Sequence, residues 1–183
     1  MKDVEKMFDE AYRLVASVVG ENGIWEIERP ITLNSDIHSC AGRCFSQVLP
    51  ENKHRCRIEI DAKILTDTTT DEAVMNVLIH EILHACKWCT GHGHKKNWKL
   101  YADRINQRYP QYQITTYAGE NDFGDEVAEE LRAFRRKYEL KCTKCGKCFY
   151  SSRLTKDILH PEIARCFTYY DHKPCCGKLI RVK

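Results

Sequence analysis

Long apolar runs are missing from this chain of 183 residues. The longest, Leu14–Val19, is interrupted by Ser17 and falls far short of the roughly 20 apolar residues that a membrane-spanning helix needs. The first residues, including Lys2, Asp3 and Glu5, are charged where a secretory signal would have an apolar stretch. We therefore expect no contact with a membrane, and a protein that works in the cytoplasm, or in the nucleus if its source is eukaryotic.

Cysteine, by contrast, is abundant. The chain has 11 cysteines, an odd number, and several of them stand in close pairs. Without an export signal this usage favours metal binding over a disulfide framework, because the cytosol keeps thiols reduced. With 43% hydrophobic and 30% charged residues, the composition is that of a globular protein, large enough for one domain with an appendage.

The charge is distributed unevenly along the chain. Residues 132–183 contain 14 Lys and Arg against 4 Asp and Glu, a balance of +10, so the preceding residues carry −7 of the total of +3. A four-thiolate zinc site would lower the +10 by about two units. This polarity indicates an acidic core domain followed by a basic module that could meet nucleic acid. A merely solvated, lysine-rich tail is the alternative.

The pattern of apolar residues predicts an α+β fold. Helical spacing and alternation predict helices at 1–19, 70–88 and 95–108, and strands at 24–33, 43–49 and 57–60. A polar, acidic stretch with two glycines at 118–130 marks a linker, placed at 118–137. The linker would join a first unit at 1–117 to a second, cysteine-rich unit at 138–183.

The segment from His80 to His84 has the pattern H-E-x-x-H. On a helix, residues four apart project from the same face, so His80 and His84 could bind one metal ion. Glu81 lies one step around the helix, close enough to meet a metal-bound water without binding the metal itself. Chance matches to this pattern are rare, so it predicts a catalytic zinc site rather than two unrelated histidines.

A catalytic zinc needs a third protein ligand and one open position. His92 and His94 both follow, in a stretch that contains Gly91 and Gly93. His94 is favoured because it lies four residues before Trp98, so that a ligand and a core-anchoring tryptophan would stand one turn apart on the same helix. His92, between the two glycines, is the alternative ligand.

The sequence resembles the SprT-like metalloproteases, a family that includes bacterial SprT, phage-encoded relatives and the eukaryotic protease Spartan. The resemblance rests on His80–Ala85, Gly93–Lys99 and Ala102–Asn106, and upstream on Ala41–Arg43 and Ile58–Ile60. It continues into the cysteine-rich part, so it covers nearly the whole chain, and its pattern is nearest to the bacterial and phage members. The family's third histidine usually precedes a glycine, as His92 does, and has an aromatic about four residues later, as His94 does.

The resemblance implies a small zincin-type α+β domain, in which helices pack on a short, mainly antiparallel sheet, followed by a C-terminal zinc ribbon. It also implies a zinc metallopeptidase, in which the ion lowers the pKa of its water towards ~7 and polarises the scissile carbonyl. Glu81 would take the proton from that water and pass it to the leaving amine. Likeness to Spartan implies a DNA-bound or DNA-crosslinked protein as substrate.

Cys142 and Cys145, two residues apart and followed by glycine, form half of a zinc-binding knuckle, and a tetrahedral site needs a second pair. Similarity to the family's ribbons indicates Cys166 and Cys175, although the family usually separates this pair by two residues and here eight intervene. Such a zinc would be structural, because a segment this short has too little core to fold alone. The rival ligands are Cys176, His172 paired with Cys175, and Cys148 in place of Cys142.

Basic and aromatic residues surround this second set of ligands. Lys144, Lys147 and Arg153, with aromatics between them, would suit contact with single- or double-stranded DNA through phosphates and bases. The alternative is that the aromatics form the ribbon's own small core.

Two further cysteine pairs, Cys40/Cys44 and Cys86/Cys89, are left without partners. Cysteine is among the most buried residue types, so we expect these residues to pack in the core. A second bound ion and a redox pair are the alternatives.

These inferences converge on a zinc metalloendopeptidase that hydrolyses protein substrates and is recruited to nucleic acid by its basic ribbon. It would hold two zinc ions, one catalytic and one structural. The first alternative is a nucleic-acid-binding or regulatory protein with a non-proteolytic zincin domain. The second is a zinc hydrolase of small amides, which would have no use for a basic appendage. The sequence does not define the oligomeric state.

Overall fold

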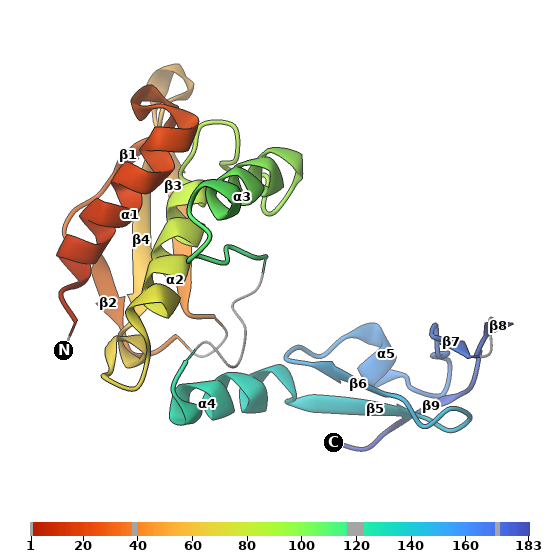
Figure 1. The fold of residues 1–183 in the computed structure, drawn as a ribbon. Helices are drawn as coiled ribbons and strands as arrows, with labels where there is room; N and C mark the ends of the chain where they lie inside the picture. Colours follow the sequence, from red (N-terminus) through yellow and green to blue (C-terminus); the bar gives the residue numbers. More distant parts are fainter. Residues whose placement is uncertain (1, 38–39, 117–122, 171–172) are drawn as a thin grey trace. The chain divides into compact units, whose positions relative to one another are not determined.

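The computed structural model describes residues 2–37, 40–116, 123–170 and 173–183, and the chain divides into two compact units, 1–128 and 129–183 (Figure 1). The boundary falls inside the range 118–137 that the sequence predicts as a linker. That range also contains α4 (Asp125–Arg135), a helix that the sequence patterns do not predict, while its residues 118–122 lie outside the described part. No helix in the described part is long and apolar enough to cross a membrane.

The first unit contains a four-stranded sheet of β1 (Glu26–Ile27), β2 (Thr32–Asn34), β3 (Gly42–Val48) and β4 (His54–Asp61). β3 pairs antiparallel with β4 over its whole length, while β1 and β2 lie along the other edge of β4 and run parallel to it. The expectation of a mainly antiparallel sheet is therefore wrong for β1 and β2. The chain reverses before β3 and again between β3 and β4, so β4 returns to the direction of the first two strands.

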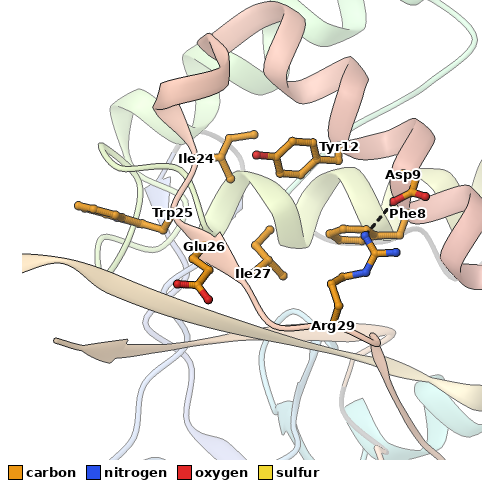
Figure 2. A pocket seen from close by; sticks show the side chains of 8 residues that line it. All are labelled: Phe8, Asp9, Tyr12, Ile24, Trp25, Glu26, Ile27 and Arg29. Carbon is orange, nitrogen blue, oxygen red and sulfur yellow. Dashed lines mark hydrogen bonds and ion pairs between the residues drawn. The ribbon is translucent and has the colours of Figure 1, made fainter.

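The single strand predicted at 24–33 is divided into β1 and β2. Pro30 lies between them and has no N–H with which to join a ladder. Arg29, just before it, turns back to the first helix: its guanidinium lies 4.6 Å from the centre of the Phe8 ring and donates to Asp9 Oδ1 at 2.8 Å (Figure 2). Through Arg29, the segment between the two strands thus contacts that helix.

Three helices, α1 (Val4–Val19), α2 (Asp71–His84) and α3 (Lys96–Arg108), complete the first unit. Their existence is confirmed. Asp3 and Thr70 cap the first two through hydrogen bonds from the backbone N–H groups of Lys6 and Ala73. Figure 1 shows α1 and α2 side by side on one face of the strands. Short 3-10 helices occupy Glu21–Gly23, Pro50–Asn52 and Ala62–Leu65.

α2 ends at His84 and not near residue 88 as predicted. The backbone that follows pairs with the segment before β1: the Trp25 N–H donates to the Ala85 carbonyl at 3.0 Å, and the Lys87 N–H donates to the Gly23 carbonyl at 2.9 Å. These tertiary hydrogen bonds replace the helical ones. The helix therefore stops directly after the second histidine of the H-E-x-x-H motif.

The core of the first unit lies between the sheet and the helices. Most of its fully buried members come from α1, β4, α2 and α3, among them Phe8, Val15, Ile58, Ile60, Val74, Leu78, Ile82, Leu83 and Ile105. Burial of several such side chains, each contributing about 1.5–3 kcal/mol, stabilises this unit without any bound ion.

The second unit has a three-stranded antiparallel sheet in the order β6-β5-β9, formed by β5 (Tyr138–Cys142), β6 (Cys148–Ser151) and β9 (Leu179–Arg181). A short helix, α5 (Lys156–Leu159), and a hairpin of β7 (Tyr169–Tyr170) and β8 (Lys173–Pro174) complete it. Its core is small, and three of its seven buried members are cysteines: Leu140, Cys142, Ile158, Ala164, Cys166, Cys175 and Leu179.

Candidate metal centres

Three histidines of the first unit converge on one point. His80 and His84 project from α2, and His94 comes from the loop that precedes α3. Their Nε2 atoms are 3.3 Å (His80 to His84), 3.2 Å (His84 to His94) and 2.9 Å (His80 to His94) apart. We call this group the His cluster.

The His cluster fits a zinc ion. A tetrahedral ion with Zn–N bonds of about 2.05 Å would hold its nitrogen ligands about 3.3 Å apart, close to the separations found. Three neutral imidazoles are also a known catalytic ligand set, which leaves a fourth position for water or substrate. The residues present could therefore hold one Zn²⁺ and leave it open to a reactant.

The electrostatics of the His cluster keep its nitrogens available as ligands. Burial lowers the pKa of His80 to about 3 and that of His84 to about 4, and the neighbouring imidazoles add to the effect. His80 Nδ1 lies 2.9 Å from the Thr115 carbonyl oxygen, so it carries the proton and leaves Nε2 with a free lone pair. No sequence signal identifies Thr115, because a backbone carbonyl serves this purpose whatever the side chain.

The structure brings in His94 and leaves out His92. His92 is exposed, and its backbone N–H donates to the Cys89 carbonyl in the turn after α2. The argument that favoured His94 is wrong in one respect: α3 begins at Lys96 with Lys95 as its N-cap, so His94 lies before the helix and not on its face. The position of His94 is therefore set by the loop before α3, and the helix itself positions only Trp98.

Glu81 is buried beside the His cluster, with 6% of its surface exposed. Its carboxylate accepts a hydrogen bond from the backbone N–H of Cys44 in β3. A Cβ added to Gly42 would lie 3.0 Å from Glu81 Cγ, so any larger residue would push the strand and this side chain apart by a few tenths of an ångström. Burial raises the pKa of Glu81 to about 8, and a cation nearby would lower it.

Four cysteines of the second unit form another candidate metal centre. Sγ atoms of Cys142 and Cys175 lie 3.7 Å apart, as do those of Cys145 and Cys166, and all four lie within 4.8 Å of one another. A tetrahedral zinc with Zn–S bonds of about 2.3 Å would place its sulfurs about 3.8 Å apart. This Cys cluster is closed by four protein ligands, as structural zinc sites are.

Backbone N–H groups stabilise thiolates in the Cys cluster. Those of Lys144 and Cys145 lie 3.4 Å from Cys142 Sγ, in the turn that Gly146 closes with a φ of 72°. A hydrogen bond from the Lys147 N–H lowers the pKa of Cys145 to about 6. Deprotonated sulfur is the form that binds metal.

The rival ligands of this centre lie elsewhere. Cys176 is exposed, with a φ of 49°, and Cys148 lies in β6 outside the group. His172 lies outside the described residues. The residues between Cys166 and Cys175 include the β7–β8 hairpin, which accommodates the unusual separation.

The remaining cysteines behave mainly as core residues. Cys56, Cys86 and Cys89 are buried, while Cys40 and Cys44 are half-buried. Burial raises the pKa of Cys89 to about 11 and also raises that of Cys86, so these thiols are poor nucleophiles at neutral pH. None of the five belongs to a metal-binding group among the described residues.

The basic residues named for nucleic acid, Lys144, Lys147 and Arg153, are all exposed. Lys144 Nζ also donates to the Cys175 carbonyl at 3.3 Å. The aromatic residues fall into two groups. Phe149 packs against the small core. Phe167 is 72% exposed, and the centre of its ring lies 4.8 Å from that of Phe149. Part of the aromatic set is therefore structural and part is open to a partner.

Comparison with known proteins places the His cluster inside a family match. The sequence model of the SprT-like family matches residues 17–118. The chain is 26% identical to Germ cell nuclear acidic protein of Drosophila melanogaster over 167 residues, which are 90% of this chain and 14% of that protein. The chain thus spans only 14% of the length of this relative. No solved structure matches it.

Proposed function

The chain belongs to the SprT-like family, and from this premise we propose that it is a zinc-dependent metalloendopeptidase with a zincin-type first unit. The observation that carries the proposal is the convergence of three Nε2 atoms within 3.3 Å of one another, next to a buried carboxylate on the same helix. A site that only stored metal would need no buried acid beside an open ligand position.

In the proposed hydrolysis each group around the site has its own role. Bound zinc supplies a Lewis acid that activates water and polarises a carbonyl. Glu81 accepts the proton of the attacking water and returns it to the leaving amine, and the Cys44 N–H holds its carboxylate in place. The Thr115 carbonyl keeps His80 in the tautomer whose Nε2 is free.

An extended polypeptide suits the strand beside the site. Among the described residues β3 pairs with β4 alone, so its other edge is open. The Asp61 N–H donates to the Ala41 carbonyl, which sets the alternation: Gly42 and Ser46 direct their backbone groups to the open edge, and Cys44 directs its carbonyl there while its N–H donates to Glu81. A peptide added there as a strand would pass Glu81, which favours a protein substrate over a small amide.

The decisive test of this activity is Glu81→Gln. We expect cleavage of an unfolded protein substrate to fall by about 10²–10⁴-fold, with zinc content unchanged, because the amide cannot take up the proton. Glu28→Gln, an exposed glutamate of the same unit, is the matched control and should cleave normally. Cleavage that persists in Glu81→Gln would contradict the mechanism.

We also propose that the second unit recruits the enzyme to DNA, with DNA-bound or DNA-crosslinked protein as substrate. The balance of +10 over residues 132–183 and the exposed Phe167 support this proposal. The compartment would be the cytoplasm, or the nucleus of a eukaryote; the name of the fly relative describes a nuclear protein.

Replacing Lys144, Lys147 and Arg153 by alanine tests recruitment. If each contacts one phosphate, the slope of log K against log salt should become shallower by about 2–3. The matched control replaces three exposed cations of the first unit, Lys6, Arg13 and Lys53. An unchanged slope in the first variant would contradict recruitment through these residues, whereas DNA binding without any cleavage would favour a non-proteolytic, nucleic-acid-binding role.

A further inference from the structure

One aromatic side chain touches every member of the His cluster. The ring centre of Trp98 lies 4.7 Å from that of His80, 5.8 Å from that of His84 and 4.6 Å from that of His94. The contacts with His80 and His94 are edge-on, and the contact with His84 is stacked. Trp98 itself is 2% exposed, so it forms a fixed wall behind the three imidazoles.

The three ligands differ in how their backbones are held. His80 and His84 lie on α2, within a continuous helical ladder. His94 lies in a loop in which Gly91 and Gly93 adopt φ values of 73° and 57°, which few other residues adopt. The edge-on contact with Trp98 therefore matters most for His94, because a loop restricts the direction of a side chain less than a helix does.

The choice of tryptophan at this position is not explained by core filling alone. Its indole N–H is buried and has no protein hydrogen-bond partner among the described residues. An unpaired buried donor is destabilising, and leucine or phenylalanine would fill a core without one. The large, rigid indole is, however, wide enough to reach three imidazoles at once.

We propose that Trp98 is a positioning residue of the His cluster, which fixes the three imidazole rings so that their Nε2 lone pairs meet at one point. The proposal rests on the function proposed above only in taking the His cluster as a zinc site. Outer residues that orient metal-binding histidines typically change metal affinity by about 10–100-fold when they are replaced.

Trp98→Leu and Trp98→Phe test this role in the full chain, with Trp88→Leu and Trp88→Phe as matched controls because Trp88 is 54% exposed. The Cys cluster is kept loaded with Zn²⁺, and the His cluster is titrated with Zn²⁺ and separately with Co²⁺. Two readouts are recorded: the Zn²⁺ dissociation constant, and the visible d–d band of Co²⁺, which is strong in four-coordinate and weak in higher-coordinate sites.

We expect Zn²⁺ affinity to fall about 10–100-fold in Trp98→Leu, with a weaker Co²⁺ band. Trp98→Phe, which keeps one of the two rings, should fall between Trp98→Leu and the wild type in both readouts. Far-UV circular dichroism establishes that each variant is folded. If Trp98→Leu does not fold, Trp98→Phe alone decides the question.

A folded Trp98 variant that matches its Trp88 control in both readouts would overturn the proposal and leave Trp98 as a core residue. Neither readout depends on peptide hydrolysis. If Glu81→Gln still cleaves, the protease mechanism is refuted, and the metal titrations still decide the role of Trp98. If the Trp98 variants bind metal like their controls, the positioning role is refuted, and the Glu81→Gln assay still decides the protease activity.

Discussion

The two candidate metal centres of this chain are built in opposite ways. The His cluster is added to a unit that already has a core of helices and sheet, and its ligands stand at the edge of that core. In the second unit, three of the four cysteine ligands are themselves members of the small core. The comparison teaches that a metal can be bound by a unit that is already folded, or can itself be needed for folding. The burial of the ligands distinguishes these two kinds of site.

The largest expected difference between the centres follows from removing one ligand from each. Cys166→Ser should unfold residues 129–183, because zinc binding supplies folding free energy of about 10–16 kcal/mol in small domains of this kind. His84→Asn should abolish metal binding at the His cluster and leave both units folded. Amide NMR spectra and limited proteolysis would measure this, and a folded second unit in Cys166→Ser would break the comparison.

A matched pair of glycine substitutions should show a smaller difference. A Cβ on Gly177 would lie 2.6 Å from Cys142 Sγ, and one on Gly42 would lie 3.0 Å from Glu81 Cγ. Gly177→Ala should therefore weaken zinc binding by the Cys cluster about tenfold or more. Gly42→Ala should cost about 1–3 kcal/mol of unfolding free energy and reduce cleavage without loss of zinc. Equal zinc loss in both variants would contradict the assignment of roles.

Acidification should destabilise the first unit once it is freed of metal by a chelator. Folded His80 and His84, with pKa values of about 3 and 4, stay neutral, whereas the unfolded chain gains protons below about pH 6.5. These histidines make the unfolded state bind more protons, whereas Glu81, with a folded pKa of about 8, is protonated in the folded state and ionised in the unfolded state down to about pH 4.5, so it opposes one of them. Two histidines outweigh one glutamate, so the unfolding free energy falls between about pH 6.5 and pH 4. The slope is up to ~1.4 kcal/mol per pH unit for each histidine.

Urea denaturation of the chelated protein at several pH values measures this slope. His80→Asn removes one of these histidines and should lower the slope by up to ~1.4 kcal/mol per pH unit. A slope that is unaffected by the substitution would show that other groups govern the acid sensitivity of this unit.

The smallest expected effect is a stabilisation. Cys176 holds a φ of 49°, which is unfavourable for a residue with a Cβ, and glycine would remove that strain. Cys176→Gly should raise the unfolding free energy of the zinc-loaded second unit by about 0.5–1 kcal/mol and keep the zinc, since Cys175 faces the Cys cluster. Loss of zinc in this variant would instead make Cys176 a ligand.

Much of the secondary structure and most members of the candidate sites could be predicted from the sequence. Helical spacing located α1 and α3, and the i, i+4 relation placed His80 and His84 on one face, because both depend only on local helix geometry. The end of α2 could not be predicted, because hydrogen bonds from the segment at 23–25 decide it. His94 was preferred over His92 on a helical argument, yet a loop with two positive-φ glycines brings it to the cluster.

The sequence by itself determined which kinds of atoms are available: a helix with two histidines and a glutamate, a pair of closely spaced cysteines, and a basic C-terminal part. These features depend on residue identity and on neighbours within a few positions. Only the tertiary structure decided which distant groups meet them. The Thr115 carbonyl, the Cys44 N–H and the Trp98 ring reach the His cluster from other elements. Such contacts depend on packing between elements, which no local pattern specifies.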